Sequence, residues 1–311
     1  MSPDPTSAAP SGVVIADKPV GLTSHQVVGR LRRLAHTRKV GHAGTLDPMA
    51  TGVLVIGIER ATRLLGHLAL TEKEYLATIR LGVATVTDDA EGDVTERRGA
   101  AELDEQQLTA AMRRLTGTID QVPSSVSAIK INGVRSYARV RAGDQVELAA
   151  RPVTVSAFDL LQRRDVEVDG LPVVDLDVRV GCSSGTYIRA LARDLGTRLG
   201  TGGHLTSLRR TKVGTFGVEE ARTLEQLEDD LGLLDLETVA RRTFPTLELD
   251  EQQAAWVRNG RRLPGLDLPG EPTAVFSPAG EFLALYRPSG QDAVAEAVFA
   301  LAASAGEGPR D

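Results

Sequence analysis

The sequence predicts an α+β fold: a mixed, mostly antiparallel sheet with surrounding helices, followed by a small β-rich C-terminal domain. Apolar residues make up 41% and charged residues 25% of the 311 residues, as in a globular chain with a substantial core. Half-buried strand patterns dominate the middle of the chain, and amphipathic helical patterns lie on either side of them. There is no regular βαβ alternation, so a doubly wound parallel sheet is not expected.

The first elements are a strand, a capped helix, a loop and a second strand. Residues 12–16 form a short apolar run, and either Thr23 or Ser24 can cap a helix with helical apolar spacing. Residues 40–52 form a glycine-punctuated loop, and the apolar run 53–58 follows it as a strand.

The remaining elements follow from the same two periodicities, with strands in the middle of the chain and short strands near its end. We expect strands at 72–81, 153–162 and 173–180, helices at 104–115, 186–199 and 250–258, extended chain at 119–130, and short strands near 274–276, 282–286 and 294–299.

Composition divides the chain into two domains and two tails. Residues 1–10 and 304–311 have the small and polar composition of disordered tails. We place the large domain at 11–243 and the small one at 244–303, which begins at Phe244 after an acidic helical stretch.

The net charge of −6 conceals two basic segments. Residues 18–80 hold ten Lys and Arg against four Asp and Glu, and residues 189–212 hold six against one. The compensating acid lies at 88–105 and 219–251, where we expect solvated helix faces and loops. Two basic segments can steer a nucleic acid onto one face, and scattered surface arginines are the alternative interpretation.

Cysteine and histidine usage excludes several kinds of site. Cys182 is the only cysteine, so neither an intramolecular disulfide nor a multi-cysteine metal site can form, and a reducing cytosol fits best. The five histidines lack the paired spacing of metal ligands, so no metal is expected. No segment has the pattern of a membrane span or an export signal, which again predicts a cytoplasmic protein.

The loop 41–48 is the strongest candidate for chemistry. Its glycines permit tight backbone conformations, and Pro48 favours an extended backbone at Asp47, which can hold the carboxylate out from a rigid loop. The structural alternative is an Asp-Pro turn in which the side chain bonds nearby backbone N–H groups.

Six segments together resemble one family, the bacterial TruB family of tRNA pseudouridine-55 synthases. The resemblance covers roughly residues 12–217, and the tail beyond Phe244 occupies the place of that family's RNA-binding PUA domain without a diagnostic motif. The matching segments are Asp17-Lys-Pro-Val-Gly-Leu-Thr-Ser-His25, Gly41-His-Ala-Gly-Thr-Leu-Asp-Pro-Met-Ala-Thr-Gly52, Lys73-Glu-Tyr75, Ser127-Ala-Ile-Lys130 with Asn132-Gly133, Cys182-Ser-Ser-Gly-Thr-Tyr-Ile-Arg189, and Leu208-Arg-Arg-Thr211.

The resemblance implies the pseudouridine synthase fold and an isomerase that converts uridine 55 in the T-loop of tRNA to pseudouridine after flipping the base into a pocket. It implies that Asp47 is the catalytic aspartate and that Arg189 is its partner. It also implies that Tyr75 is catalytic: its ring packs against the target base, and its hydroxyl is placed for proton exchange at C5. Asp47 either attacks C1′ or removes a C2′ proton, and the sequence leaves both open.

Further residues receive roles by the same resemblance. Tyr187 and Leu208 complete the pocket wall, and His42 fills the space that the uridine vacates. Lys18 and Lys130 match positions for which phosphate contact is the natural role. The family needs neither cofactor nor metal. We expect a monomer whose partner is the T-stem-loop of tRNA.

Two other functions compete with this interpretation. One is a noncatalytic tRNA-binding or RNA-folding protein on the same scaffold. The other is an unrelated aspartate-nucleophile enzyme such as a phosphotransferase, for which metal-binding carboxylates beside Asp47 would be expected and are not found.

Overall fold

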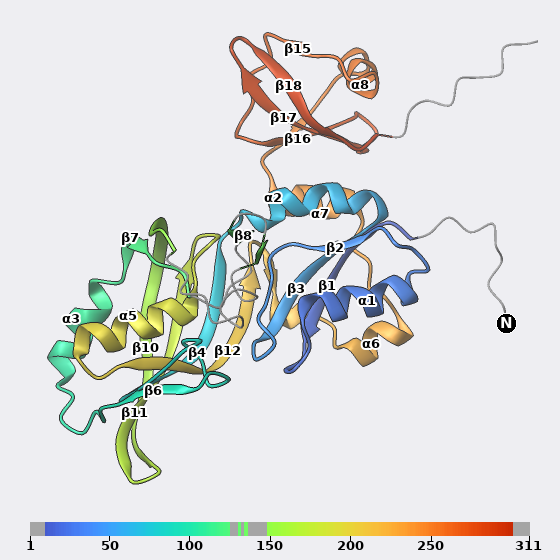
Figure 1. The fold of residues 1–311 in the computed structure, drawn as a ribbon. Coiled ribbons are helices and arrows are strands. Elements are labelled where there is room, and N and C mark those ends of the chain that lie inside the picture. Colours follow the sequence, from blue (N-terminus) through green and yellow to red (C-terminus); the bar gives the residue numbers. More distant parts are fainter. Residues whose placement is uncertain (1–9, 125–129, 132–133, 136–147, 301–311) are drawn as a thin grey trace, which may run out of the picture.

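The computed structural model describes residues 10–124, 130–131, 134–135 and 148–300. Its two main sheets have nine and five strands, and the larger one comes first in the chain (Figure 1). The predicted α+β class is therefore confirmed.

The large sheet is antiparallel except at one contact, where β3 and β12 run parallel. Strand β12 lies between β3 and β4, so it joins the N-terminal strands to the long central ones. The order is β1 (Gly12–Lys18), β3 (Thr51–Ile58), β12 (Gly203–Val213), β4 (Lys73–Leu81), β11 (Leu171–Cys182), β10 (Arg151–Val168) and β7 (Gly117–Gln121), with β2 (Val40–His42) beside β3 and β13 (Phe216–Gly217) beside β12.

Strand β12 is the longest element that the periodicity did not predict. Its buried side includes His204 and Arg210, two polar residues, so the apolar alternation of a strand is weak. The other predicted strands and helices are present, and β10 and β11 are longer than expected because the hairpin that they form extends to a turn at residues 169–170.

Two small ribbons and several short helices complete the large domain. The ribbons are β5 (Val83–Thr85) with β6 (Val94–Arg97), and β8 (Lys130–Ile131) with β9 (Val134–Arg135). The short helices are η1 (Glu59–Leu64), α2 (Leu65–Ala69), η2 (Val218–Glu220), α6 (Leu224–Asp229) and α7 (Leu236–Thr243).

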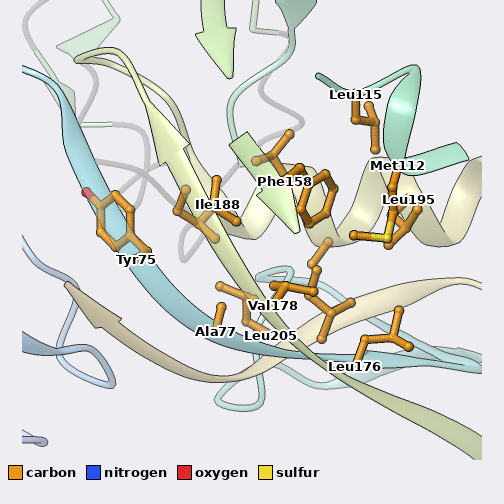
Figure 2. Packing of buried hydrophobic residues seen from close by; sticks show 14 of the residues in the cluster. Tyr75, Ala77, Met112, Leu115, Phe158, Leu176, Val178, Ile188, Leu195 and Leu205 are labelled. Atoms are coloured by element: carbon orange, nitrogen blue, oxygen red, sulfur yellow. The ribbon is translucent and has the colours of Figure 1, made fainter. Parts of the chain in front are cut away.

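Helices α3 (Glu105–Arg113) and α5 (Ile188–Leu199) cover the sheet where β4, β11 and β10 lie (Figure 1). Figure 2 shows Met112 and Leu195 of these helices beside Phe158 and Leu176 of the sheet. Helix α1 (Ser24–Leu34) instead packs against β1 and β3. It begins as predicted, because the Thr23 side chain accepts a hydrogen bond from the backbone N–H of Gln26 and Gln26 bonds back in a capping box.

The smaller sheet lies beyond α2 and α7 in Figure 1. It has a core of its own but also contributes Phe276, Phe282 and Phe299 to a cluster that contains Leu64 and Phe216 of the large domain. Its elements are β14 (Thr246–Glu248), β16 (Thr273–Phe276), β17 (Phe282–Ser289), β18 (Asp292–Val298), β15 (Leu263–Pro264) and helix α8 (Glu251–Arg258).

A search for membrane spans found no helix of sufficient length and apolarity among the described residues.

Candidate active site

The loop that carries Asp47 connects β2 to β3, and glycine conformations shape it. Gly44 has φ +92° and Gly52 has φ +100°, a region that other residues rarely adopt. A Cβ atom at Gly52 would lie 2.2 Å from the carbonyl oxygen of Arg210, so the close approach of β3 to β12 requires glycine.

The segment between β1 and α1 holds the backbone on both sides of Asp47. The Ser24 hydroxyl accepts from the Leu46 N–H at 2.9 Å and donates to the Leu46 carbonyl at 3.1 Å. The N–H of Gly21 donates to the Pro48 carbonyl at 2.8 Å. The carboxylate of Asp47 therefore projects from a fixed backbone.

Lys18 supports the same segment from the core, and its environment bears on the expectation that it contacts a phosphate. Its side chain is fully buried, and Nζ donates to the carbonyls of Pro19 at 2.9 Å, Leu22 at 2.7 Å and Pro48 at 3.3 Å. Burial lowers its pKa to about 8, while the charge of Asp47 opposes that change. An ammonium bonded to three backbone carbonyls in the core is not exposed to solvent, so its burial argues against the predicted phosphate contact.

Arg189 lies between two carboxylates. Its Nε is 3.0 Å from Oδ2 of Asp47, and its Nη1 is 3.3 Å from Oδ2 of Asp89 and donates to the Thr87 carbonyl at 2.9 Å. The side chains of Arg189 and Asp89 are each 5% exposed, whereas that of Asp47 is 37% exposed. Asp47 is thus the member of the triad that solvent or a substrate can reach.

Asp89 is a site residue that sequence reasoning missed. We expected the acidic residues of 88–105 to be exposed to solvent, but Asp88 and Asp89 are both buried. Asp88 pairs with Arg193 at 3.2 Å, one helical turn beyond Arg189, and burial raises the pKa of Asp88. One feature of the sequence could have indicated these ion pairs: two adjacent acids, Asp88 and Asp89, match two arginines that are four residues apart on one predicted helix.

Tyr75 and Leu208 lie on neighbouring strands, β4 and β12, and share a hydrophobic cluster with Leu46 and Ile188. In the register Leu208 is paired with Ala77, two residues beyond Tyr75. Figure 2 shows Tyr75 at one end of the group, with its hydroxyl pointing away from the other labelled side chains. Burial raises the pKa of Tyr75, and the positive charge of Arg210 opposes the rise. The phenol is therefore protonated at neutral pH.

Tyr187 immediately precedes α5, and Gln121 fixes its backbone. The Tyr187 N–H donates to Oε1 of Gln121 at 2.8 Å, and Nε2 of Gln121 donates to the Tyr187 carbonyl at 3.1 Å. Gln121 is buried at the end of β7. This amide places the start of the helix that carries Arg189, and no sequence pattern indicated that role.

His42 ends β2 and faces a second histidine. The rings of His25 and His42 have centroids 5.6 Å apart in an edge-to-face arrangement. Burial, followed by the charge of His25, lowers the pKa of His42, so its imidazole is neutral at pH 7.

Two further residues named from the sequence are Lys130 and the single cysteine, Cys182. Lys130 lies in β8, and its side chain is outside the described part of the chain. Cys182 is buried, and burial raises the pKa of its thiol to about 11, which leaves no thiolate for nucleophilic chemistry. Within the described ranges no cluster of three or more His, Cys, Asp or Glu residues is suited to a metal ion.

Three family models match consecutive parts of the chain. The model described as TruB family pseudouridylate synthase (N terminal domain) matches residues 32–188. The model described as tRNA pseudouridylate synthase B C-terminal domain matches residues 189–247, and the model described as tRNA Pseudouridine synthase II, C terminal, matches residues 244–300.

Similar proteins carry one name. The tRNA pseudouridine synthase B of Paenarthrobacter aurescens (strain TC1) is 57% identical over 298 residues, which cover 93% of this chain and 95% of the relative. The protein of the same name from Streptomyces griseus is 56% identical over 295 residues, which cover 94% of this chain and 99% of the relative.

Solved structures share the fold across both sheets. The structure of an H/ACA RNP bound to a substrate RNA containing 2′-deoxyuridine includes a chain with a TM-score of 0.67 and 26% identity, covering 94% of this chain and 86% of that one. A chain of the Cbf5-Nop10-Gar1 complex has a TM-score of 0.68 at the same identity, covering 94% and 85%.

Proposed function

This chain belongs to the TruB family of pseudouridylate synthases, and from this premise we propose that it converts uridine 55 in the T-loop of tRNA to pseudouridine. Relatives at 56–57% identity named tRNA pseudouridine synthase B support the activity and the tRNA substrate. The observation that carries the proposal is the ion pair between the partly exposed Asp47 and the buried Arg189, with Tyr75 near enough that the charge of Asp47 adds to burial in raising the pKa of its phenol.

The reaction breaks the N1–C1′ bond of uridine, turns the uracil and joins C5 to C1′. In one route the Asp47 carboxylate attacks C1′, uracil leaves with the bonding electrons, and C5 then displaces the carboxylate. In the other route Asp47 removes the C2′ proton while uracil leaves C1′ with the bonding electrons, which gives a glycal; C5 then adds to C1′ as that proton returns to C2′. The C5 proton is finally lost and N1 is protonated, so both routes are isomerisations.

We assign the surrounding residues by their contacts. Arg189 stabilises the ionised form of Asp47, and Asp89 holds Arg189 from the other side. Tyr75 offers a ring face for stacking on a flipped uracil. His42, neutral and partly buried, is placed to stack rather than to transfer charge.

The test is incubation of the purified protein with an unmodified tRNA transcript in EDTA, followed by mapping of pseudouridine. We expect one product site, in the T-loop, and none in a transcript whose T-loop uridine is replaced by cytidine. Product at another position of the tRNA would contradict the T-loop assignment but would still demonstrate pseudouridine synthase activity. Tight binding without any product would instead favour the noncatalytic RNA-binding function.

A further inference from the structure

Arg210 is a buried cation without a role in the proposed chemistry. It lies on β12, two residues beyond Leu208, and its side chain is only 1% exposed. Its Nε donates to the Val53 carbonyl at 2.7 Å, Nη2 to the Gly44 carbonyl at 3.1 Å and Nη1 to the Thr45 carbonyl at 3.4 Å. Two of these acceptors belong to the loop that carries Asp47.

The backbone of Arg210 touches the other functional segments. In the sheet, Arg210 is paired with Tyr75 of β4 on one side and with Gly52 of β3 on the other. One residue therefore contacts the strand that carries the aromatic ring, the strand that follows the catalytic loop, and the loop itself.

Packing alone does not explain an arginine at this place. Among the described residues no carboxylate lies within ion-pair distance of the guanidinium, so its burial has no ionic compensation. Removing a charge from water costs several kcal/mol, and an apolar side chain of similar volume fills a core without that cost. The guanidinium adds bonds to the loop carbonyls, because its planar fork spans acceptors on β3 and on the loop that a compact ammonium cannot reach together. Its charge also acts on the Tyr75 phenol.

We propose that Arg210 is a positioning residue that fixes the Asp47 loop relative to Tyr75. The inference rests on the proposed function, because the geometry that it sets is that of Asp47 and the uracil platform. A displacement of about 1 Å in a reacting group can cost on the order of a hundredfold in rate. Loss of these three bonds thus lowers turnover without removing any group that touches the RNA.

The experiment compares Arg210→Met and Arg210→Lys with wild type in single-turnover rate at saturating tRNA and in tRNA dissociation constant. Lys73→Met is the matched control. Lys73 is also a buried cation bonded only to backbone carbonyls, but these belong to Ala69 and Thr71 beside α2 rather than to the loop. We expect the Arg210 variants to lose about tenfold to a hundredfold in rate, with tRNA affinity within about threefold, and Lys73→Met to keep the wild-type rate.

Hydrogen exchange of peptides covering residues 43–50 gives a second readout that does not depend on activity. We expect faster exchange there in Arg210→Lys than in Lys73→Met. Exchange in that loop equal to wild type, or a rate loss that Lys73→Met shares, would overturn the inference. So would failure of both Arg210 variants to fold, since the arginine would then serve the whole domain. Wild-type protein that forms no pseudouridine would refute the proposed function, and the exchange comparison would still decide the role of Arg210.

Discussion

At the scale of single residues, Asp47 is the group that both candidate mechanisms require. An amide in its place can neither attack C1′ nor accept the C2′ proton, so Asp47→Asn should abolish product while tRNA affinity stays nearly unchanged. Arg189 keeps Asp89 as an ionic partner, so the free energy of unfolding should fall by less than the roughly 3–5 kcal/mol of a broken isolated pair. On one preparation, single-turnover kinetics measure product formation, a binding titration measures tRNA affinity, and urea unfolding measures the free energy of unfolding. Product formed by the pure variant would remove Asp47 from the chemistry.

Arg189 contacts two carboxylates and a carbonyl, and this geometry makes its shape as important as its charge. We expect Arg189→Lys to reduce the single-turnover rate at least about a hundredfold, because a single ammonium cannot span Asp47 and Asp89 in place of the guanidinium fork. Arg193→Lys, on the next turn of the same helix, is the control, since Arg193 pairs with Asp88 and not with Asp47. Equal losses in the two variants would show that the effect is one of helix stability.

Lys73 gives a prediction in pH. Burial lowers its pKa from 10.5 to about 8 in the folded protein, so between pH 8 and 10.5 the unfolded chain binds more protons than the folded one. Its contribution to stability is therefore least favourable below pH 8 and improves as the pH rises through that window. The melting temperature of wild type minus that of Lys73→Met should increase from pH 8 to pH 10. Parallel curves for the two proteins would show that the lysine is not shifted.

The roles of residues that belong to a recognisable motif could be predicted from the sequence. The roles of residues that depend on whether a charged side chain is buried could not. The sequence indicated Asp47, Tyr75 and Arg189 as one group, and the structure places Arg189 against Asp47. It did not indicate that Lys18 and Asp89 are buried. Asp89 is paired with Arg189, far away in the chain, and Lys18 bonds the carbonyls of nearby Pro19 and Leu22 and of the more distant Pro48. Only the folded chain turns these partners inward, where they compensate burial.

At the scale of elements, periodicity predicted the strands and helices whose buried side is apolar, such as β3 and α3, and failed for β12. A strand whose interior positions include His204 and Arg210 gives little hydrophobic signal. These polar side chains are tolerated inside because each has a backbone partner, for example the Val83 carbonyl 2.9 Å from Nδ1 of His204.

The parallel contact of β3 with β12 predicts the effect of one substitution. Gly52→Ala puts a Cβ 2.2 Å from the Arg210 oxygen and strains a positive φ, so it should destabilise the fold by about 3 kcal/mol or more. Gly21→Ala is the control, because φ there is also positive but no atom lies within 4 Å of the added Cβ. Its cost should be about 1–2 kcal/mol from the backbone alone. Equal midpoints in urea for the two variants would contradict the close packing of these strands.

At the scale of the whole molecule, the count of basic residues overstates the surface available to RNA. Lys18 and Lys73 of the first basic segment and Arg189 and Arg210 of the second are buried. The exposed cations of the first segment include Arg32 and Arg33 on α1. Charge counted along a sequence thus mixes cations that build the site with cations that can meet phosphates.

The two sheets are joined by more than the chain between them. At the end of α7, Arg242 forms an ion pair with Glu220 at 2.7 Å in the large domain, and the guanidinium of the preceding residue, Arg241, lies 3.9 Å from the ring centre of Phe276 in the small sheet. Together with the phenylalanine cluster that both sheets share, these contacts mean that deletion of the chain beyond Phe244 removes part of the core of the large domain.

Shared packing of this kind predicts that the protein unfolds in one transition, because neither sheet can lose its structure without exposing the apolar surface of the other. The chain offers a local probe: Trp256 of α8 is its only tryptophan and lies in the small sheet's domain. Its fluorescence should change at the same urea concentration as the far-ultraviolet circular dichroism, to which the large domain contributes most. Two midpoints, with the fluorescence change at lower urea, would show that the C-terminal sheet unfolds independently and that the shared cluster contributes little to its stability.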